Sequence, residues 1–249
     1  MNVLFLSALA EEAAEVAEEA VEAVEEAAEA APSWFQTAFG DLADMPVWGW
    51  ILLALLLVGG VIAYRAIKGG QKTVWTTRML SVGAMCIALS SVLSMIKLFE
   101  MPNGGSVTAV SLLPLILFAY VYGTVPGLIL GFVHGVLQFM FGGWFLNVFQ
   151  FLLDYPLAFA VLGLAGLFNK MKDERAGLAV GTVVGCAARW FVAALAGLVF
   201  WSDLTEGIWP AVVYTVTYNA SYMIPECIIT AVIAVLVGPR LIKELRKVK

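Results

Sequence analysis

The chain has 249 residues, of which 61% are hydrophobic and only 13% are charged. Soluble domains are typically about 45–50% apolar and about 25% charged, so this composition excludes an ordinary soluble domain and predicts a membrane protein. The net charge of −5 combines two unlike regions. Residues 1–45 carry eleven acidic residues and no basic one, whereas the remainder carries eight acidic and 14 basic residues, a net charge of +6.

The acidic region, residues 1–45, is predicted to be an extracytoplasmic segment. Its first ten residues are apolar but lack the basic start of a secretory signal, so we do not interpret them as one. The stretch from Glu11 to Ala31 consists almost entirely of Glu, Ala and Val, which favours a helix up to Pro32. A solvated helix is the simpler interpretation, and a docking helix for a partner is the alternative.

Residues 46–77 are predicted to form an additional transmembrane helix followed by a basic cytoplasmic linker. Trp48 to Ala66 is long enough to cross a hydrocarbon core of about 30 Å. Tryptophans begin this span and basic residues follow it, which places the N-terminus outside and residues 65–78 inside.

Residues 78–249 are predicted to form a six-helix membrane domain. The expected spans are 78–98, 108–122, 126–141, 148–168, 178–201 and 210–237. With these spans, the basic residues at 65–78, 169–177 and 238–249 all fall on the cytoplasmic side. The outer connections hold Glu100, Asp203 and Glu206 but no Lys or Arg. The fold class is therefore an all-α polytopic membrane protein in a cell membrane, with a cytoplasmic C-terminus.

The chain lacks the motifs of several chemistries. Its three cysteines lie in apolar runs without CxxC spacing, which favours packing over a metal site or a disulfide. There is no GxxxxGK[ST] loop for a nucleotide and no HExxH pair for zinc. His134, in the third of these spans, is expected to be a packed core histidine. We therefore predict no catalytic residue, metal or cofactor.

Polar and aromatic residues gather instead near the outer ends of the last three spans. We expect them to line one pocket just below the outer surface, since an ionisable group within a membrane span generally faces a cavity or a partner. A carboxylate, an amide and aromatic rings suit a small flat cation. The candidate binding residues are Trp144, Asp154, Tyr155, Arg189, Trp201, Tyr214 and Asn219.

Each of these residues has a simpler explanation. The tryptophans and Tyr214 are also typical of the aromatic belt at a membrane interface. Asp154 and Arg189 could merely pair with each other. Glu226, deeper in the last span and next to Pro225, could satisfy freed backbone groups or join a polar network, and the sequence leaves it open.

From about residue 78 to 240 the chain resembles the thiamine-specific S-components of energy-coupling factor (ECF) transporters. The resemblance rests on the following stretches, in order: MPNGGSVT (101–108), GFVHGVLQF (131–139), FLLDYPLAFAVLGLAGLF (151–168), ALAGLVFW (194–201) and YTVTYN (214–219). It covers about two thirds of the chain and implies a six-helix protein that captures the vitamin from outside and hydrolyses no ATP. The partners it implies are thiamine, a transmembrane coupling subunit and two ATPase subunits.

The resemblance also implies roles for individual residues. Asp154 and Tyr155 match the family's acidic-Tyr pair, which holds the aminopyrimidine ring, although Glu is common at the first position. The remaining matches are a basic residue at Arg189, a tryptophan at Trp201, the Tyr and Asn of the last helix at Tyr214 and Asn219, and a loop aromatic at Trp144.

Two departures concern the ligand shell. A His of some members is Ala193 here, and a Trp and a Glu of some members fall on Gly105 and Ala109. Part of the shell must then be rebuilt, for which the loop from Asn103 to Ser106 and Glu226 are candidates.

A docking surface is predicted in the first span of this domain. Ala84 and Ala88 lie four residues apart, and small residues at this spacing let helices approach closely in lipid. In S-components an AxxxA in this helix resembles the docking face for the coupling subunit.

Three functions compete at this point. The leading hypothesis is a high-affinity thiamine-binding subunit of an ECF transporter, with another small vitamin or a thiamine precursor as the alternative substrate. A membrane-embedded enzyme using Asp154, His134 and Glu226 lacks any paired-ligand spacing. A purely structural membrane scaffold leaves the converging polar groups unexplained.

Overall fold

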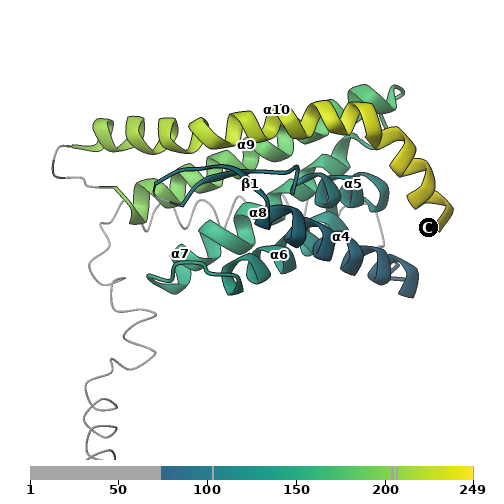
Figure 1. The fold of residues 1–249 in the computed structure, drawn as a ribbon, viewed down its shortest axis with the longest axis horizontal. Helices are drawn as coiled ribbons and strands as arrows, with labels where there is room; N and C mark the ends of the chain where they lie inside the picture. Colours follow the sequence, from purple (N-terminus) through teal and green to yellow (C-terminus); the bar gives the residue numbers. More distant parts are fainter. Residues whose placement is uncertain (1–73, 103, 203–204, 206, 249) are drawn as a thin grey trace, which may run out of the picture. The chain divides into compact units, whose positions relative to one another are not determined.

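The computed structural model describes residues 74–102, 104–202, 205 and 207–248, and these residues form a mostly helical body (Figure 1). The acidic segment 1–45 and the additional span at 48–66 lie outside the described residues. The helices are α4 (Thr77–Met95), α5 (Leu113–Tyr122), α6 (Thr124–Met140), α7 (Val148–Leu152), α8 (Ala158–Ala160), α9 (Glu174–Phe200) and α10 (Ile208–Val248). A π-helical segment, Leu153–Leu157, joins α7 to α8, and a 3₁₀ segment, Val161–Phe168, follows α8.

Local sequence signals set several helix boundaries. The hydroxyl of Thr76 accepts a hydrogen bond from the Met79 amide at 3.2 Å and caps α4. The carboxylate of Asp173 does the same for α9, accepting from the Arg175 amide at 2.9 Å. Between α5 and α6 the chain reverses at Gly123, whose φ of 101° is rarely adopted by residues with a side chain.

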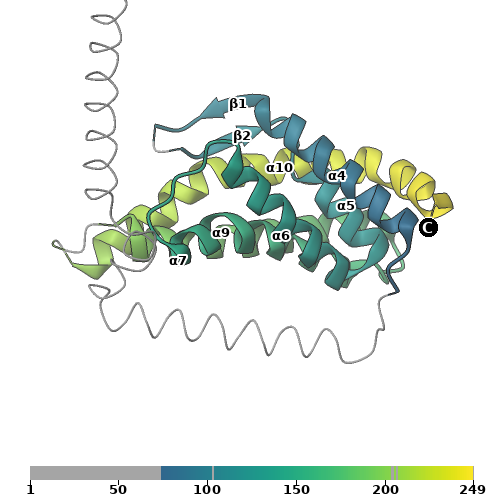
Figure 2. The same ribbon diagram turned by 90° about the horizontal axis from the view of Figure 1, so that it is seen from below.

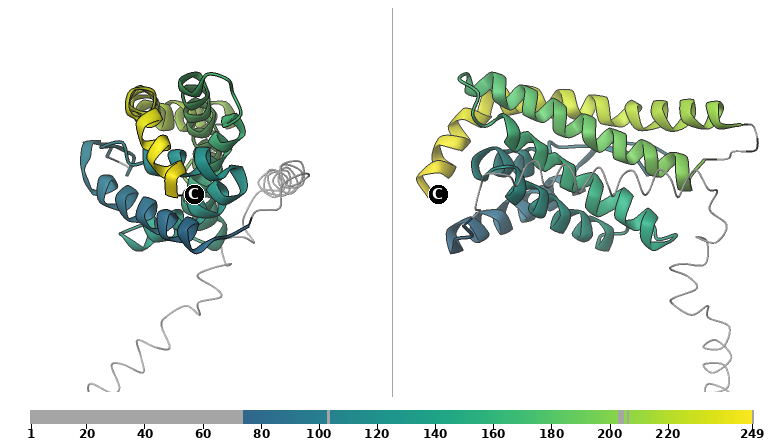
Figure 3. Two further views of the ribbon diagram at one scale, coloured as in Figure 1. Left: turned by 90° about the vertical axis from the view of Figure 1, so that its right-hand side faces the viewer. Right: turned by 180° about the vertical axis from the view of Figure 1, so that it is seen from behind.

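Helix α5 lies at the centre of the described body. It packs against α4, α6, α9, α10 and the 3₁₀ segment, and every residue from Leu113 to Val121 is buried. A helix that is apolar on all sides is expected to be enclosed by others. The end-on view in Figure 3 shows the helices gathered in a bundle.

Glycines bring α6 close to the segment that follows α7. Gly127, Gly131 and Gly135 lie four residues apart along α6, on the side that faces residues 155–163. A Cβ added to Gly131 would overlap the backbone of Phe159, and one added to Gly135 would overlap that of Tyr155. Small residues at this spacing allow the close backbone approach that stabilises helix pairs in lipid.

The stretch from 148 to 168 is one continuous helical region with a change of helical pitch. Pro156 lies inside the π-helical segment and has no amide hydrogen to donate, so a regular α-helical ladder is broken here. Single-turn π segments are frequent at functional sites. Asp154 and Tyr155 both belong to this segment.

Helices α9 and α10 are the two longest and lie side by side (Figures 1 and 3). The indole Nε1 of Trp190 donates to the Val216 carbonyl at 3.2 Å and joins them. Helix α10 contains Pro225 and Pro239 and turns near its C-terminal end (Figure 1).

The connection after α4 differs from the prediction. A helical span was expected over 108–122, but α5 begins only at Leu113. The preceding residues form an antiparallel hairpin of β1 (Lys97–Glu100) and β2 (Ser106–Thr108), visible beside the end of α4 in Figure 2. Hydropathy does not distinguish a short apolar strand from the first turn of a helix.

Four of the described helical stretches are long and apolar enough to cross a membrane: 77–95, 148–168, 174–200 and 208–247. By length and composition, these four stretches agree with the predicted all-α multi-pass protein. Two of the six expected spans are shorter, because α5 has 10 residues and α6 has 17. At a rise of about 1.5 Å per residue, α5 alone covers roughly half of a hydrocarbon core.

Candidate functional site

Asp154 is held by two hydrogen bonds to its Oδ2 atom. Nε2 of the buried Gln150 donates at 2.6 Å, and the indole Nε1 of Trp201 donates at 3.0 Å. Gln150 in turn accepts from the Leu146 amide at 3.0 Å through its Oε1. Asp154 is therefore linked to the end of α9 through Trp201, as expected. Gln150 was not predicted, although a polar side chain one helical turn before Asp154 in an apolar span is a usable signal.

Tyr155 joins the same region to the loop before α7. Its hydroxyl accepts a hydrogen bond from the Trp144 amide at 2.7 Å. Its ring packs against Phe139 and Phe151, with ring centroids 5.4 Å and 6.3 Å away. The Trp144 side chain itself is 73% exposed, so it lines the rim of this aromatic cluster rather than its interior.

These elements meet at one end of the described body. In Figure 1 the start of α7, the end of α9 and the start of α10 lie together, opposite the C-terminus. At the opposite end, Arg246 of α10 pairs with Glu174 of α9, with Nη1 and Oε1 2.8 Å apart. The aromatic site and the basic C-terminal residues are thus at opposite ends.

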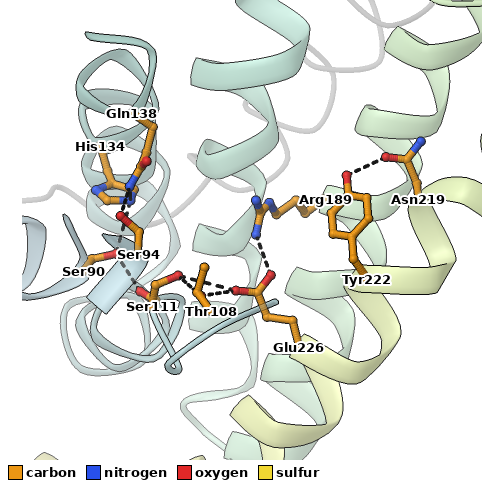
Figure 4. A network of polar contacts seen from close by, with 10 residues as sticks. All are labelled: Ser90, Ser94, Thr108, Ser111, His134, Gln138, Arg189, Asn219, Tyr222 and Glu226. Atoms are coloured by element: carbon orange, nitrogen blue, oxygen red, sulfur yellow. Dashed lines mark hydrogen bonds and ion pairs between the residues drawn. The ribbon is translucent and has the colours of Figure 1, made fainter. Parts of the chain in front are cut away.

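Arg189 does not pair with Asp154. Its Nη1 lies 3.5 Å from Oε2 of Glu226, and its guanidinium carbon lies 4.3 Å from the centroid of the Phe159 ring. The side chain of Arg189 is 14% exposed and that of Glu226 is 3% exposed. The alternative that Asp154 and Arg189 form a simple pair is therefore wrong, because α10 supplies the acid (Figure 4).

Glu226 is also tied to the chain that follows the hairpin. Thr108 donates its hydroxyl to Oε1 of Glu226 at 2.5 Å, and the Ser111 hydroxyl lies 3.5 Å from the same oxygen. Val110, between these two residues, has a φ of 65°, which branched residues seldom adopt. Such a conformation persists only where the surroundings hold it, and the contacts with Glu226 contribute to that.

Three tyrosines and Asn219 follow one another along α10. Tyr214 stacks on Tyr218 with centroids 5.9 Å apart, and Tyr218 meets Tyr222 at 6.0 Å. The Asn219 amide donates to the Thr215 carbonyl at 2.9 Å, and its Oδ1 accepts from the Tyr222 hydroxyl at 2.7 Å (Figure 4). Asn219 is thus buried and oriented by its own helix, whereas Tyr214 is 48% exposed.

The hairpin loop packs on this row of tyrosines. A Cβ added to Gly105 would come within 2.5 Å of the Tyr222 ring, so only glycine fits there. The Gly105 amide lies 3.4 Å from the Tyr218 hydroxyl. Tyr222 therefore occupies the space beside Gly105. Gly105 is one of the positions at which this chain lacks a ligand-shell residue found in some members of the S-component family. Of the loop suggested as a replacement, Asn103 lies outside the described residues.

His134 is fully buried between α4 and α6, as predicted. Its Nε2 lies 3.2 Å from the Ser90 hydroxyl and 3.1 Å from Nε2 of Gln138 (Figure 4). Its ring meets that of Phe159 edge-on. Ser90 also donates to the Ser111 carbonyl at 2.6 Å. The histidine belongs to an interhelical polar cluster that reaches the turn beside Glu226. Among the described residues, no group of three or more His, Cys, Asp or Glu side chains could hold a metal ion.

The structure thus connects four of the seven candidates directly: Asp154 with Trp201, and Tyr155 with Trp144. Arg189 pairs with Glu226, and Asn219 is hydrogen-bonded to Tyr222. Tyr214 lies nearer the start of α10 than either of these pairs. Ala84 and Ala88 are both exposed on α4, which is compatible with a docking face and not with packing in the core.

Chemically, this arrangement is suited to binding a cation. A carboxylate with an aromatic neighbour supplies ion pairing and cation–π attraction. The buried amide of Asn219 and the tyrosine hydroxyls supply directed hydrogen bonds. These groups fit recognition of a small polar aromatic cation better than a reaction.

Comparisons with known proteins agree on one family. The family described as "Thiamine transporter protein (Thia_YuaJ)" matches residues 80–245 of the chain. Thiamine transporter ThiT of Bacillus subtilis (strain 168) is 33% identical over 159 residues, covering 58% of this chain and 82% of the relative. Thiamine transporter ThiT of Lacticaseibacillus paracasei is 31% identical over 153 residues, covering 53% of this chain and 75% of the relative.

A solved structure has the same fold. It is ThiT from Listeria monocytogenes, with a TM-score of 0.55 and 23% sequence identity, and the match covers 68% of this chain and 96% of that one. At this identity the likeness concerns the fold alone.

Proposed function

The chain belongs to the thiamine transporter protein family, and we propose from this that it is a thiamine-binding membrane subunit that captures the vitamin outside the cell. Thiamine combines a flat aminopyrimidine ring with a cationic thiazolium ring. The observation that carries the proposal is Asp154, a carboxylate in an apolar span that is oriented by Gln150 and by the indole of Trp201. A charge kept at this depth needs a partner of opposite sign, and a cationic ligand provides it.

We assign the ligand contacts to the seven predicted residues. Asp154 and Tyr155 bind the aminopyrimidine, and Trp201 with Trp144 stacks beside the rings. Tyr214, Asn219 and Arg189 complete the shell from α9 and α10. Two hydrogen bonds support this assignment. The one from Trp201 holds an indole against Asp154, and the one from the Trp144 amide orients the Tyr155 hydroxyl.

The transport step belongs to other subunits in this proposal. The relatives are named as transporters rather than enzymes, and this chain has no nucleotide-binding loop. A transmembrane coupling subunit would dock on α4 at Ala84 and Ala88, and two ATPase subunits would drive uptake. The proposal includes a cytoplasmic C-terminus. The basic residues of α10 and of the loop before α9, which lie at the end opposite the site, support it.

Thiamine titration of the purified protein, followed by tryptophan fluorescence, tests this function. We expect saturable quenching that is much reduced in Trp201→Phe, since Trp201 would lie against the ligand. Trp75→Phe is the matched control, because Trp75 precedes α4, which begins at the end of the body near the C-terminus, opposite α7 (Figure 1). Native mass spectrometry then identifies the retained molecule. Retention of a different vitamin without any thiamine would contradict the proposed substrate and preserve the class.

A further inference from the structure

The charges within the membrane-spanning part of the described chain do not balance. Of the described Asp, Glu, Lys and Arg residues, only Asp154, Arg189 and Glu226 lie inside an apolar span rather than at its end, in a connection or beyond residue 237. Two carboxylates and one guanidinium leave one negative charge in excess. A bound monocation would neutralise this set.

The ion pair between Arg189 and Glu226 uses only part of the hydrogen-bonding capacity of the guanidinium. The two groups share one contact of 3.5 Å, whereas strong Arg–carboxylate pairs are bidentate and about 2.7–2.9 Å long. The Nε atom of Arg189 is buried without a hydrogen-bond partner among the described residues. The guanidinium therefore retains donors with which it could bind an anionic oxygen.

Glu226 is firmly fixed on its own side. Its Oε1 accepts the Thr108 hydroxyl at 2.5 Å and lies 3.5 Å from that of Ser111, and its side chain is 3% exposed. Figure 4 shows the carboxylate between these hydroxyls and the guanidinium. Its negative charge is thus held next to Arg189, the one basic group inside the spans that the structure describes.

We propose that Glu226 is a specificity-determining residue, which offsets the charge of Arg189 so that the site accepts cationic thiamine and discriminates against its phosphorylated forms. The inference rests on the proposed function. Without Glu226, Arg189 would repel the thiazolium ring and attract a phosphate group. With Glu226, a phosphate has to compete with a fixed carboxylate for the same guanidinium and is repelled by it.

The test compares the affinities of purified variants for thiamine and for thiamine monophosphate. Glu226→Gln should weaken thiamine binding relative to monophosphate binding, changing the ratio of the two Kd values by at least about 10-fold. A unit charge about 10 Å away at an effective dielectric constant of about 20 produces a change of this size. Glu226→Asp should restore most of the preference, because the charge is kept.

A double variant separates charge from structure. Glu226→Gln with Arg189→Gln removes both charges and leaves the single excess negative charge of Asp154. It should return the ratio toward that of the parent, even if both ligands bind more weakly. Glu174→Gln is the control for losing a carboxylate, since its ion pair with Arg246 is at the far end of the helices.

The outcomes are distinct. If Glu226→Gln weakens both ligands equally, Glu226 only holds the turn at Thr108 and Ser111, and the inference is overturned while the proposed function stands. The same conclusion follows if the double variant keeps the altered ratio of the single one. If the parent binds no thiamine, the proposed function fails and this inference fails with it.

Discussion

At the scale of single residues, the site depends on how the protein holds a carboxylate in an apolar span. Asp154 receives two side-chain hydrogen bonds on one oxygen, from Gln150 and Trp201. The second oxygen, Oδ1, has no hydrogen bond to a described residue in this structure. The protein thus orients the acid and leaves part of its hydrogen-bonding capacity for a ligand.

Asp154→Asn isolates the charge. The amide oxygen of Asn can still accept from both Gln150 and Trp201, so the melting temperature should change little. Thiamine affinity should fall by about 10- to 150-fold, which corresponds to about 1.5–3 kcal/mol for a charge-assisted hydrogen bond. Isothermal titration with a thermal melt of the same sample measures both quantities.

Asp154→Glu is the conservative control and should bind thiamine better than Asp154→Asn, since it keeps the charge. An Asp154→Asn protein that binds like the parent but melts much earlier would show that Asp154 is structural. The ligand assignment would then be wrong.

At the scale of the elements, the candidate site depends on the contact between α6 and the π-helical segment. The backbones meet at Gly131 and Gly135, where an added Cβ would overlap Phe159 and Tyr155. The polar cluster of His134, Gln138 and Ser90 joins the other side of α6 to α4. Helix α6 therefore packs against the π-helical segment with Asp154 and Tyr155 on one side, and against α4, the helix of the predicted docking face, on the other.

Gly131→Ala should destabilise the protein by about 1–3 kcal/mol, because the methyl group has to push the backbone at Phe159 away. The loss is measured as a lower thermal midpoint in detergent. Gly142→Ala is unsuitable as a control, because its φ is 112°. Gly185→Ala serves as the milder comparison, since the atom nearest to its added Cβ lies at 3.3 Å, compared with 2.2 Å at Gly131. Equal melting of Gly131→Ala and the parent would show that α6 can move away at little cost.

The exposed alanines of α4 give a prediction about docking. Ala84→Trp and Ala88→Trp should abolish thiamine uptake in cells and leave binding to the purified protein intact. A bulky ring prevents the close approach of another helix, and both positions are exposed on α4 rather than packed in the core. Uptake assays and thiamine titrations of the same variants check this.

Met85→Trp is the matched control for added bulk, because Met85 is also exposed on α4 but is not part of the small-residue pair. A parallel loss of binding in the alanine variants would mean that these residues support the fold. Normal uptake would mean that the coupling subunit docks elsewhere.

At the scale of the whole molecule, the proposed function is that of a capture subunit that depends on other subunits for energy. Purified protein should bind thiamine and show no ATPase activity, because the chain has no phosphate-binding loop. A coupled ATPase assay during successive purification steps checks this. Activity that stays constant per milligram through the last step would contradict the proposed division of labour.

The sequence by itself determined the class of protein and the approximate course of its helices. Hydropathy and the positions of Lys and Arg are strong local signals, since every span must be apolar over its length. The same reasoning found Asp154, Arg189 and Glu226, because ionisable residues within apolar runs stand out one at a time. It also identified the direct neighbours Asp154 and Tyr155, which are adjacent in the chain.

Only the tertiary structure decided which of these groups meet. Arg189 pairs with Glu226 rather than Asp154, and Thr108 reaches Glu226 from a hairpin that was expected to be a loop and the start of a helix. Partner choice depends on the rotation and separation of helices that are far apart in sequence. Close glycine contacts and a proline-induced π segment set these quantities, and hydropathy alone does not specify them.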